Sequence, residues 1–554
     1  MKCLINIYAK PFFAGILMIV LPALIFVSCG DDNNPATTQT VQGVAATGAP
    51  MANAQVTLVD SKGTRITATT DSQGRYTIQK SGLTPPFAVE VTNDQGETFH
   101  ALAFAYGRIN ITPLTEILTS MMVSGNNPAT IMENLANVTK EQLTQAKSQL
   151  VDNLSPLLEA FGAEDTDLIT GSFEANSKGI DALLDLITVT FDPDSKELTL
   201  SASGQTLFEA QISDSGMTPT TTLSSATLLT IPQLATKLFG DYHVVDFNAD
   251  TSDETSEINW GEAQFTADGM ANLTFSHSNG GEPGSETHNY TLQSTGALKI
   301  GDETGVQGAC TTDKSFMALA DTSTQDQDTG IVFFIKKSET APTLEGQYHR
   351  LEFTRNNTGI YETDSWSSDF EFTWNQENQS ASYVDEGETL SVAFNSKGFF
   401  EGASGLRVYP ALNGSLLIIP HATPDDAGLT LMIKKPVSPY PNFDTTNGNT
   451  NDKNFTAPGF AIDTEENSFT AEKGTLAWTK TSSTLGVFNF NEEGNRTLQS
   501  QNGVFQFSQG GQAVSGEFGL YPSSGVLVWV DEKESDQDTD FGCHVAIETW
   551  PEAP

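Results

Sequence analysis

The sequence predicts a mainly β protein with a helical insert: an N-terminal β-sandwich, a helical module and three tandem antiparallel β repeats. Three observations lead to this fold class. Residues 41–92 alternate like short strands, residues 112–190 carry apolar residues at helical spacing, and residues 240–550 repeat one strand pattern. Each repeat is expected to form a lipocalin-like meander barrel. The alternative is a six-bladed β-propeller with two blades per repeat.

The chain is long enough for several domains, and 38% of its 554 residues are hydrophobic, which suits packed cores rather than disorder. Shifts in composition and periodicity suggest where the parts begin and end. The predicted parts are a signal peptide (1–28), a flexible tether (29–40), a β-sandwich (41–110), a helical module with a β-hairpin (111–239), β repeat 1 (240–345), β repeat 2 (346–436), a linker (437–458) and β repeat 3 (459–554).

The first residues have the features of a secretory signal. An apolar run from Phe12 to Val27 is short for a spanning helix and suits a cleaved signal. The run continues into Ser28-Cys29-Gly30, and this ending resembles the lipobox of bacterial lipoproteins. The resemblance implies cleavage before Cys29, lipidation of its thiol and a membrane anchor. Gly30, in place of Asp after the cysteine, favours the outer membrane, with the protein facing the periplasm or the cell surface.

The charge balance excludes one class of partner. The chain has 70 acidic and 27 basic residues, a net charge of −43. Because phosphate backbones are bound by basic surfaces, we expect no nucleic-acid partner. The same balance disfavours electrostatic docking on anionic lipid, so the predicted contact with the membrane is the lipid anchor.

Two stretches near the N-terminus predict strands joined by tight turns. Gly48–Val56 runs from a turn into an alternating strand, and Thr70–Ile78 runs from an Asp- and Gly-containing turn into another. Both stretches resemble the carboxypeptidase regulatory-like (transthyretin-like) domain, in an arrangement similar to that of some bacterial lipoproteins. The resemblance implies a small β-sandwich. Because this module is usually non-catalytic, it implies no chemistry.

Residues 112–190 change to the helical period. Pro113 suits the first turn of a helix, and Thr139–Gln142 resembles a capping box that opens a second one. A third helix is expected over residues 180–187, followed by a hairpin over residues 188–201. The apolar stripes of these helices predict packing surfaces.

The C-terminal half contains an internal repeat. Gly240-Asp241-Tyr242-His243 recurs as Gly346-Gln347-Tyr348-His349, and the strand Gly330–Lys337 recurs as Gly428–Lys435. A third, weaker copy ends at residues 542–547. A period near 100 residues with many short strands fits a meander whose first and last strands pair. The equivalent positions of His243 and His349 predict a shared structural role.

No catalytic residues are predicted. The seven histidines are scattered and show no metal-binding or protease spacing, so we expect no enzyme. The acidic loop with Asp536, Asp538 and Asp540 alternates carboxylates, which suit Ca²⁺, the one cofactor considered. The alternative for this loop is a solvated turn, because Phe541 separates the third aspartate from the glycine that a calcium loop requires.

Two cysteines, Cys310 and Cys543, remain beyond the lipidation site. Export to an oxidising compartment favours a disulfide between them, and the alternative is two buried free thiols. A bond needs Cα atoms within about 7 Å. Separate barrels strung along the chain would keep repeats 1 and 3 apart, whereas a closed ring would make them neighbours.

The sequence therefore predicts a lipid-anchored, non-catalytic envelope protein with a binding or structural role. Its partner would be an unidentified protein, a glycan or a small apolar ligand. Two alternatives stay open: a carrier that holds a small apolar ligand inside a barrel, and a glycan-active hydrolase. Barrels filled with Phe and Leu would count against the carrier, and two carboxylates a few ångströms apart in a deep cleft would favour the hydrolase.

The lipobox-like ending predicts the effect of replacing Cys29. Cys29→Ala removes the thiol that lipidation requires, so the variant should remain soluble or unprocessed in the producing bacterium. Membrane fractionation, with mass analysis of the N-terminal peptide, measures both properties. A Cys29→Ala chain that still reaches the membrane in a shorter, processed form would contradict the assignment.

Overall fold

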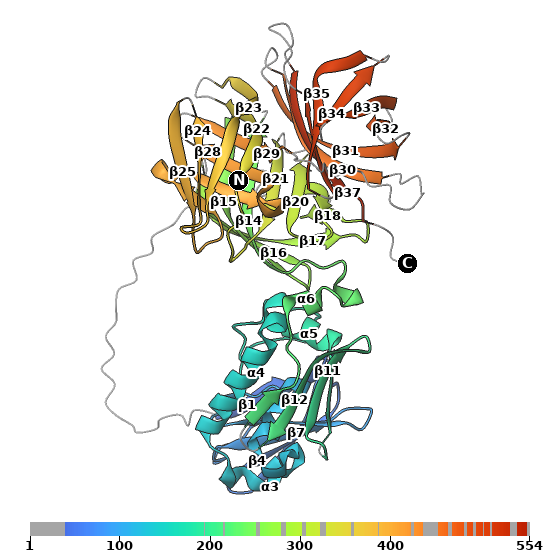
Figure 1. Cartoon of the computed structure of the whole chain (residues 1–554). Coiled ribbons are helices and arrows are strands. Elements are labelled where there is room, and N and C mark those ends of the chain that lie inside the picture. Colours follow the sequence, from blue (N-terminus) through green and yellow to red (C-terminus); the bar gives the residue numbers. More distant parts are fainter. Residues whose placement is uncertain are drawn as a thin grey trace, which may run out of the picture. The chain divides into compact units, whose positions relative to one another are not determined.

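The computed structural model divides into two compact units (Figure 1). The N-terminal unit comprises the described residues up to Ala235 together with Thr266–Asp268, and the barrel body comprises the other described residues from Thr236 onward. The structure describes residues 39–192, 194–213, 216–250, 255–278, 284–301, 306–321, 328–355, 359–385, 387–422, 426–435, 453–463, 468–480, 485–490, 495–501, 504–509, 512–523, 525–531 and 540–550.

The N-terminal unit begins with the predicted β-sandwich. Its sheets have the strand orders β6-β1-β9 and β5-β4-β7-β8, and β2 pairs with β3. The turn before β6 forms because Asp71 Oδ1 accepts the backbone N–H groups of Gln73 and Arg75 at 2.9 and 2.8 Å, while Gly74 has a φ of 73°. The strands are β1 (Thr40–Val44), β2 (Ala46–Thr47), β3 (Ala49–Pro50), β4 (Gln55–Asp60), β5 (Arg65–Thr69), β6 (Arg75–Gln79), β7 (Phe87–Thr92), β8 (Thr98–Ala103) and β9 (Gly107–Arg108).

The helices that follow begin at the predicted caps. In the α4 capping box, Thr139 Oγ1 accepts the Gln142 N–H at 3.2 Å and Gln142 Oε1 accepts the Thr139 N–H at 2.9 Å. None of the described helices is both long and apolar enough to cross a membrane. The helices are α2 (Pro113–Met122), α3 (Ile131–Asn134), α4 (Lys140–Ala160), α5 (Ile180–Leu186) and α6 (Ser225–Leu228), and the 3-10 turns are Ser124–Asn126, Pro128–Thr130, Leu135–Asn137 and Pro232–Leu234.

The predicted hairpin at residues 188–201 is half of a larger sheet. β10 (Thr188–Asp192) and β11 (Glu197–Ala202) pair as expected, but the sheet continues through β12 (Gln205–Ser213) and β13 (Gly216–Pro219). The difference arises at Ser203-Gly204, where both residues have positive φ and turn the chain back tightly. The two-strand expectation is therefore corrected to a four-stranded meander.

Each repeat forms a closed eight-stranded barrel with the strands in chain order, which confirms the barrels rather than the propeller. Closure comes from pairing of the first and last strands: β14 with β21, β22 with β29, and β30 with β37. In Figure 1 the strands of the three barrels are coloured from green through yellow and orange to red.

The strand bounds follow. Barrel 1 consists of β14 (Gly240–Asp250), β15 (Thr255–Thr266), β16 (Met270–Ser278), β17 (Ser285–Leu292), β18 (Ala297–Ile300), β19 (Val306–Cys310), β20 (Phe316–Asp321) and β21 (Asp328–Lys336). Barrel 2 consists of β22 (Gly346–Arg355), β23 (Tyr361–Asn375), β24 (Ser380–Asp385), β25 (Glu388–Phe394), β26 (Phe400–Gly402), β27 (Arg407–Ala411), β28 (Leu416–Ala422) and β29 (Ala427–Lys434), with 3-10 turns Ala403–Gly405 and Leu412–Gly414. Barrel 3 consists of β30 (Lys453–Asp463), β31 (Ser468–Lys480), β32 (Leu485–Phe490), β33 (Asn495–Gln501), β34 (Val504–Gln509), β35 (Gln512–Ser523), β36 (Val526–Asp531) and β37 (Asp540–Glu548).

The repeated Gly-x-Tyr-His tetrad closes one end of barrels 1 and 2. Tyr242 is fully buried and donates its hydroxyl to the Lys314 carbonyl at 2.8 Å. Tyr348 does the same with the Gly414 carbonyl at 2.7 Å. Each ring lies inside its own barrel, and its hydroxyl links the first strand to the turn between the sixth and seventh strands. The repeated tyrosine therefore has a structural role in both barrels.

One apolar core joins the three barrels to each other, so they do not lie apart like beads. We call it the shared core. At its centre the Phe353 ring lies 4.8 Å from the Phe247 ring of barrel 1 and 4.4 Å from the Phe460 ring of barrel 3, measured between centroids. Its larger members include Val245, Phe247, Ile258, Phe333 and Ile335 of barrel 1, Leu351, Phe353, Ile418, Leu431 and Ile433 of barrel 2, and Phe460, Ile462, Val528 and Val545 of barrel 3.

Polar contacts also connect barrels 1 and 3. The Trp550 indole N–H donates to the Cys310 carbonyl at 2.7 Å, and the Trp550 backbone N–H donates to the Thr295 carbonyl at 2.8 Å. On barrel 3, the Ala471 N–H donates to Thr329 Oγ1 at 2.6 Å. The first and last repeats are therefore neighbours although each repeat closes on itself.

The shared core predicts a large effect for Phe353→Ala. Removing a ring that touches two other barrels should lower the free energy of unfolding by about 3–5 kcal/mol. Calorimetric and denaturant unfolding of the full chain measure this loss. The control is Val384→Ala on β24, because Val384 is 53% exposed and its truncation should cost less than about 0.5 kcal/mol. Equal losses in the two variants would contradict a shared core.

Candidate functional site

Several residues singled out in the sequence lie outside the described residues. Cys29 precedes them, and Asp536 and Asp538 fall in segment 532–539. Asp540 begins β37, but its side chain is outside the described set. The lipidation and Ca²⁺ hypotheses therefore stay predictions. Within the described part of the chain, no three His, Cys, Asp or Glu side chains are grouped to hold a metal ion.

The predicted disulfide is not formed in the structure. Cys310 and Cys543 are both buried and both free. Cys310 belongs to the interior of barrel 1, whereas Cys543 faces the shared core. Neighbouring barrels are thus not sufficient for a bond, because the two thiols lie in different apolar cores. Burial raises the pKa of both thiols, that of Cys543 to about 12.

His243 and His349 are both buried, and the structure shows a packing role for the first. The His243 ring leaves barrel 1 and lies 5.0 Å from the Tyr409 ring and 5.6 Å from the Phe399 ring of barrel 2, between centroids. Its Nε2 is 3.3 Å from the Gly398 carbonyl oxygen. Burial lowers the pKa of His243 to about 4, so the ring is neutral at this contact.

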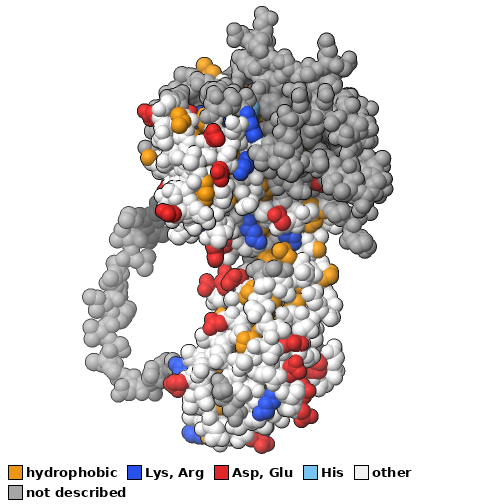
Figure 2. All heavy atoms as spheres, viewed as in Figure 1, with side chains coloured by type: hydrophobic (Ala, Val, Ile, Leu, Met, Phe, Trp, Pro, Cys, Tyr) orange, Lys and Arg blue, Asp and Glu red, His pale blue; other side chains and the backbone are white. Residues whose placement is uncertain are grey.

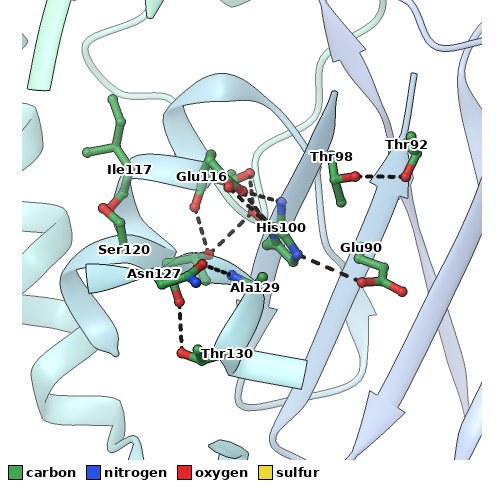
Figure 3. A network of polar contacts seen from close by, with 12 residues as sticks. Glu90, Thr92, Thr98, His100, Glu116, Ile117, Ser120, Asn127, Ala129 and Thr130 are labelled. Atoms are coloured by element: carbon green, nitrogen blue, oxygen red, sulfur yellow. Dashed lines mark hydrogen bonds and ion pairs between the residues drawn. The ribbon is translucent and has the colours of Figure 1, made fainter. Parts of the chain in front are cut away.

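A second buried histidine, which the sequence analysis did not single out, fastens α2 to the sandwich (Figure 3). His100 on β8 has its Nδ1 3.0 Å from Glu116 Oε2 of α2, and its Nε2 is 3.8 Å from Glu90 Oε2 of β7. The hydroxyls of Thr115 and Thr119 donate to the His100 carbonyl at 3.1 and 3.3 Å. Because these hydroxyls point to the backbone, the network holds a helix in place and presents no activated nucleophile.

The inward face of barrel 1 has an apolar end filled by aromatic rings. The Phe265 ring contacts those of Tyr242, Tyr290 and Phe334 edge to face, at centroid distances of 5.2, 5.5 and 5.3 Å. These rings belong to one buried cluster with the aliphatic residues around them. This packing argues against a carrier whose apolar ligand occupies that end of the barrel.

The other end of the barrel 1 interior is polar. Side chains alternate between the two faces of a strand, so Asp246 and Asn248 of β14 point inward, as do Glu257 and Asn259 of β15. All four are buried. The strand register places Asp246 opposite Asn259 and Asn248 opposite Glu257. We call these four residues the polar chamber.

The polar chamber contains an amide with unmet hydrogen bonds. Asn248 Nδ2 donates to Asp246 Oδ2 at 2.8 Å, and burial raises the pKa of Asp246. Asn259 is fully buried, and neither its Oδ1 nor its Nδ2 has a hydrogen-bond partner. Leaving such a group unsatisfied costs about 1–3 kcal/mol, so the Asn259 amide lowers the free energy of unfolding of the protein.

Barrel 2 places charges at the same end of its interior. The strand register makes Glu352 the counterpart of Asp246, and Arg350 the counterpart of Val244. Arg350 contacts Glu352, and its Nη1 lies 3.1 Å from Asp385 Oδ2. Nε2 of the half-buried His421 is 3.8 Å from Glu352 Oε1. Barrel 2 therefore balances its interior carboxylates with an arginine from its own first strand.

Neither charged interior was found from the sequence. A signal exists in barrel 1, where Asp246-x-Asn248 and Glu257-x-Asn259 place polar residues at every second position of strands that are otherwise apolar. The pattern indicates a polar barrel interior only once the strand register shows that the two pairs lie opposite each other. Acidic side chains are also widespread on the surface of the protein, and Lys and Arg side chains lie among them on the face in view (Figure 2).

Comparison with known proteins adds little to this geometry. No family model matches the chain, and no curated protein matches it in sequence. The solved structures it resembles include a mutant of the vaccine antigen transferrin binding protein B from Haemophilus parasuis Hp5, at 10% identity and TM-score 0.22, over 56% of this chain and 76% of that one.

Two further structures give similar values. Intact Ap-TbpB, with N and C lobes, has 10% identity and TM-score 0.21, over 56% of this chain and 77% of that one. Isotype 1 transferrin binding protein B from serogroup B Neisseria meningitidis has 9% identity and TM-score 0.19, over 55% of this chain and 65% of that one. TM-scores this low do not establish a common fold, so the architecture rests on the strand pairing of this chain.

The buried His243 predicts an acid-sensitive contact between barrels 1 and 2. Its pKa is about 4 in the folded protein and 6.5 unperturbed, so between these values the unfolded chain binds a proton that the folded chain does not. The free energy of unfolding therefore falls as the pH falls through this window, by about 2 kcal/mol at pH 5. In His243→Gln this contribution disappears.

Denaturant unfolding at pH 7.5 and pH 5 measures the effect. The wild type should lose about 2 kcal/mol more than His243→Gln between the two conditions. Equal losses would show that a different group accounts for the acid sensitivity.

Proposed function

We propose that the chain is a non-catalytic binding protein of the bacterial cell envelope, lipid-anchored through Cys29, whose binding site is the polar chamber of barrel 1. The sequence supports the anchor through its lipobox-like ending. The carboxypeptidase regulatory-like resemblance of residues 41–92 also fits an exported protein. The shared core packs barrel 1, which contains the chamber, against barrels 2 and 3.

The contacts of three histidines favour binding over catalysis. The ring nitrogens of His100 and His288 lie against carboxylates, and His243 lies against a backbone carbonyl. In none of these three contacts does a ring meet a hydroxyl or thiol that it could activate. The two carboxylates of the polar chamber are buried and stand opposite amides on the inward face of barrel 1, whereas the hydrolase alternative calls for two carboxylates in a deep cleft.

The observation that carries the proposal is the unsatisfied amide of Asn259. Buried polar groups in folded proteins nearly always have hydrogen-bond partners, and exceptions call for a specific explanation. A ligand that completes the hydrogen bonds of Asn259 supplies one. The chamber is polar, so the ligand is polar as well, in contrast to the apolar ligand of the carrier alternative.

Replacing Asn259 by leucine tests whether the amide serves binding or folding. If it serves binding, Asn259→Leu removes an unsatisfied group of similar size and should raise the free energy of unfolding of the ligand-free protein by about 1–3 kcal/mol. Asn248→Leu is the matched control. It lies one register pair away, and because its Nδ2 donates to Asp246, its loss should destabilise the protein.

Unfolding of the full-length proteins in detergent compares the three chains. The proposal requires that Asn259→Leu raise the free energy of unfolding and that Asn248→Leu lower it. A loss of stability in Asn259→Leu equal to that in Asn248→Leu would give Asn259 a folding role and overturn the proposed site.

A further inference from the structure

The N-terminal unit contains a pocket of its own, apart from the polar chamber of barrel 1. Its volume is about 320 Å³, and three segments of the chain form its walls. The first runs from the end of β8 into β9, the second is residues 140–147 of α4, and the third is residues 167–170. Small-molecule sites are typically concave, with apolar walls and a few well-placed polar groups, and this pocket has both.

Hydrogen bonds within the chain hold the walls of the pocket in place. The Tyr106 hydroxyl donates to the Leu83 carbonyl at 2.6 Å, and the Tyr106 ring packs edge to face on Phe87 with the centroids 4.9 Å apart. The Ile169 carbonyl accepts the Asn110 N–H at 2.8 Å. Because the walls are already fixed without a ligand, little conformational entropy is lost when one binds.

The apolar part of the lining comes from all three walls. Leu102, Leu143 and Ile169 are buried, and they line the pocket together with Phe104 and Tyr106. An apolar group in the pocket would replace water against these side chains. Such burial is favourable in proportion to the apolar area that leaves water, so the pocket suits a ligand with an apolar body.

The charged part of the lining is positive on balance. Four charged side chains line the pocket: Arg108, Lys140, Lys147 and Asp167. Lys147 forms an ion pair with Asp167, and the other carboxylate oxygen of Asp167 accepts two backbone N–H groups at 3.0 and 2.8 Å. The side chains of Arg108 and Lys140 have no ion pair or hydrogen bond with any residue that the structure describes. Two positive charges therefore face the pocket without a counter-charge.

These two cations determine the charge of the ligand. The chain as a whole has a net charge of −43, but charges beyond about 8 Å are largely screened at physiological ionic strength, so the nearby lining counts most. The guanidinium of Arg108 can bind a carboxylate through two parallel hydrogen bonds. Since Asp167 lines the same pocket, a carboxylate with one negative charge meets less repulsion there than a doubly charged phosphate.

We propose that this pocket binds a small carboxylate with an apolar body. The carboxylate pairs with Arg108 and Lys140. The apolar body lies against Leu102, Leu143 and Ile169. This site goes beyond the proposed function of the polar chamber and does not depend on it, so the failure of either site leaves the other unaffected.

Probes that each change one property of the ligand test the proposal. Phenylacetate is compared with phenylacetamide, which lacks the charge, with acetate, which lacks the apolar body, and with benzyl phosphate, which has a different head group. Calorimetric titration of the full-length protein in detergent records binding, after subtraction of the titration into detergent alone. We expect phenylacetate to bind at least tenfold more tightly than each of the other three. No binding of phenylacetate at millimolar concentration, or binding of any other probe as tight as that of phenylacetate, would overturn the ligand class.

Two variants locate the binding. Arg108→Gln removes one of the two unpaired charges and should weaken phenylacetate binding at least tenfold. Arg65→Gln is the matched control, because Arg65 is an exposed arginine on β5 of the same unit and does not line the pocket. It should leave binding unchanged. Thermal unfolding without ligand should give both variants the melting temperature of the wild type, since neither arginine has an ion pair with a described residue. Binding that survives Arg108→Gln, or that falls equally in Arg65→Gln, would overturn the assignment to this pocket.

Discussion

The barrel body depends on strands that are buried on both faces. On β21, Phe334 points into barrel 1 while Phe333 points into the shared core, and on β28 Leu417 and Ile418 divide in the same way. Because side chains alternate across a strand, one run of apolar residues supplies two cores at once. A shift of register by one residue would exchange the two sets, so the same alternation fixes how each barrel closes and where its neighbours pack.

This double burial also explains where the polar residues can lie. Outward positions near the shared core must be apolar, since a charge there would have no water. The inward positions at one end of barrels 1 and 2 instead carry Asp246 and Glu352 at equivalent places. In barrel 2 an arginine accompanies the carboxylates, and in barrel 1 a valine replaces it. The two barrels thus have one scaffold and different interior chemistry, as expected where function resides in sites placed on a common fold.

The N-terminal unit uses polar contacts in another way. His100 joins β8 to α2 through Glu116, and the threonine hydroxyls of α2 bond back to the same strand. Each partner in this network is supplied by a neighbouring element, so the network fixes the position of a helix. By contrast, neither the Oδ1 nor the Nδ2 atom of Asn259 has a hydrogen-bond partner.

Local features of this protein could be predicted from its sequence because they depend on neighbours along the chain. The turn at Asp71–Gly74, the capping box at Thr139–Gln142 and the repeat beginning at Gly240 and Gly346 all involve short-range hydrogen bonds or a strand period. The four-stranded sheet after residue 188 was missed because its second turn depends on positive φ at Ser203-Gly204. At the turn, the capping box and the repeat, the sequence motifs were sufficient to predict the local structure.

Tertiary structure alone decided the remaining features, because they depend on which face a side chain occupies and which barrel lies next to it. Two cysteines in an exported chain favour a disulfide, but Cys310 points into barrel 1 and Cys543 into the shared core. The tetrad gave His243 and His349 equivalent positions, but only the packing of barrel 2 places aromatic rings around His243. The polar chamber likewise exists because strand register brings Asp246 opposite Asn259, a relation that no spacing along a single strand contains.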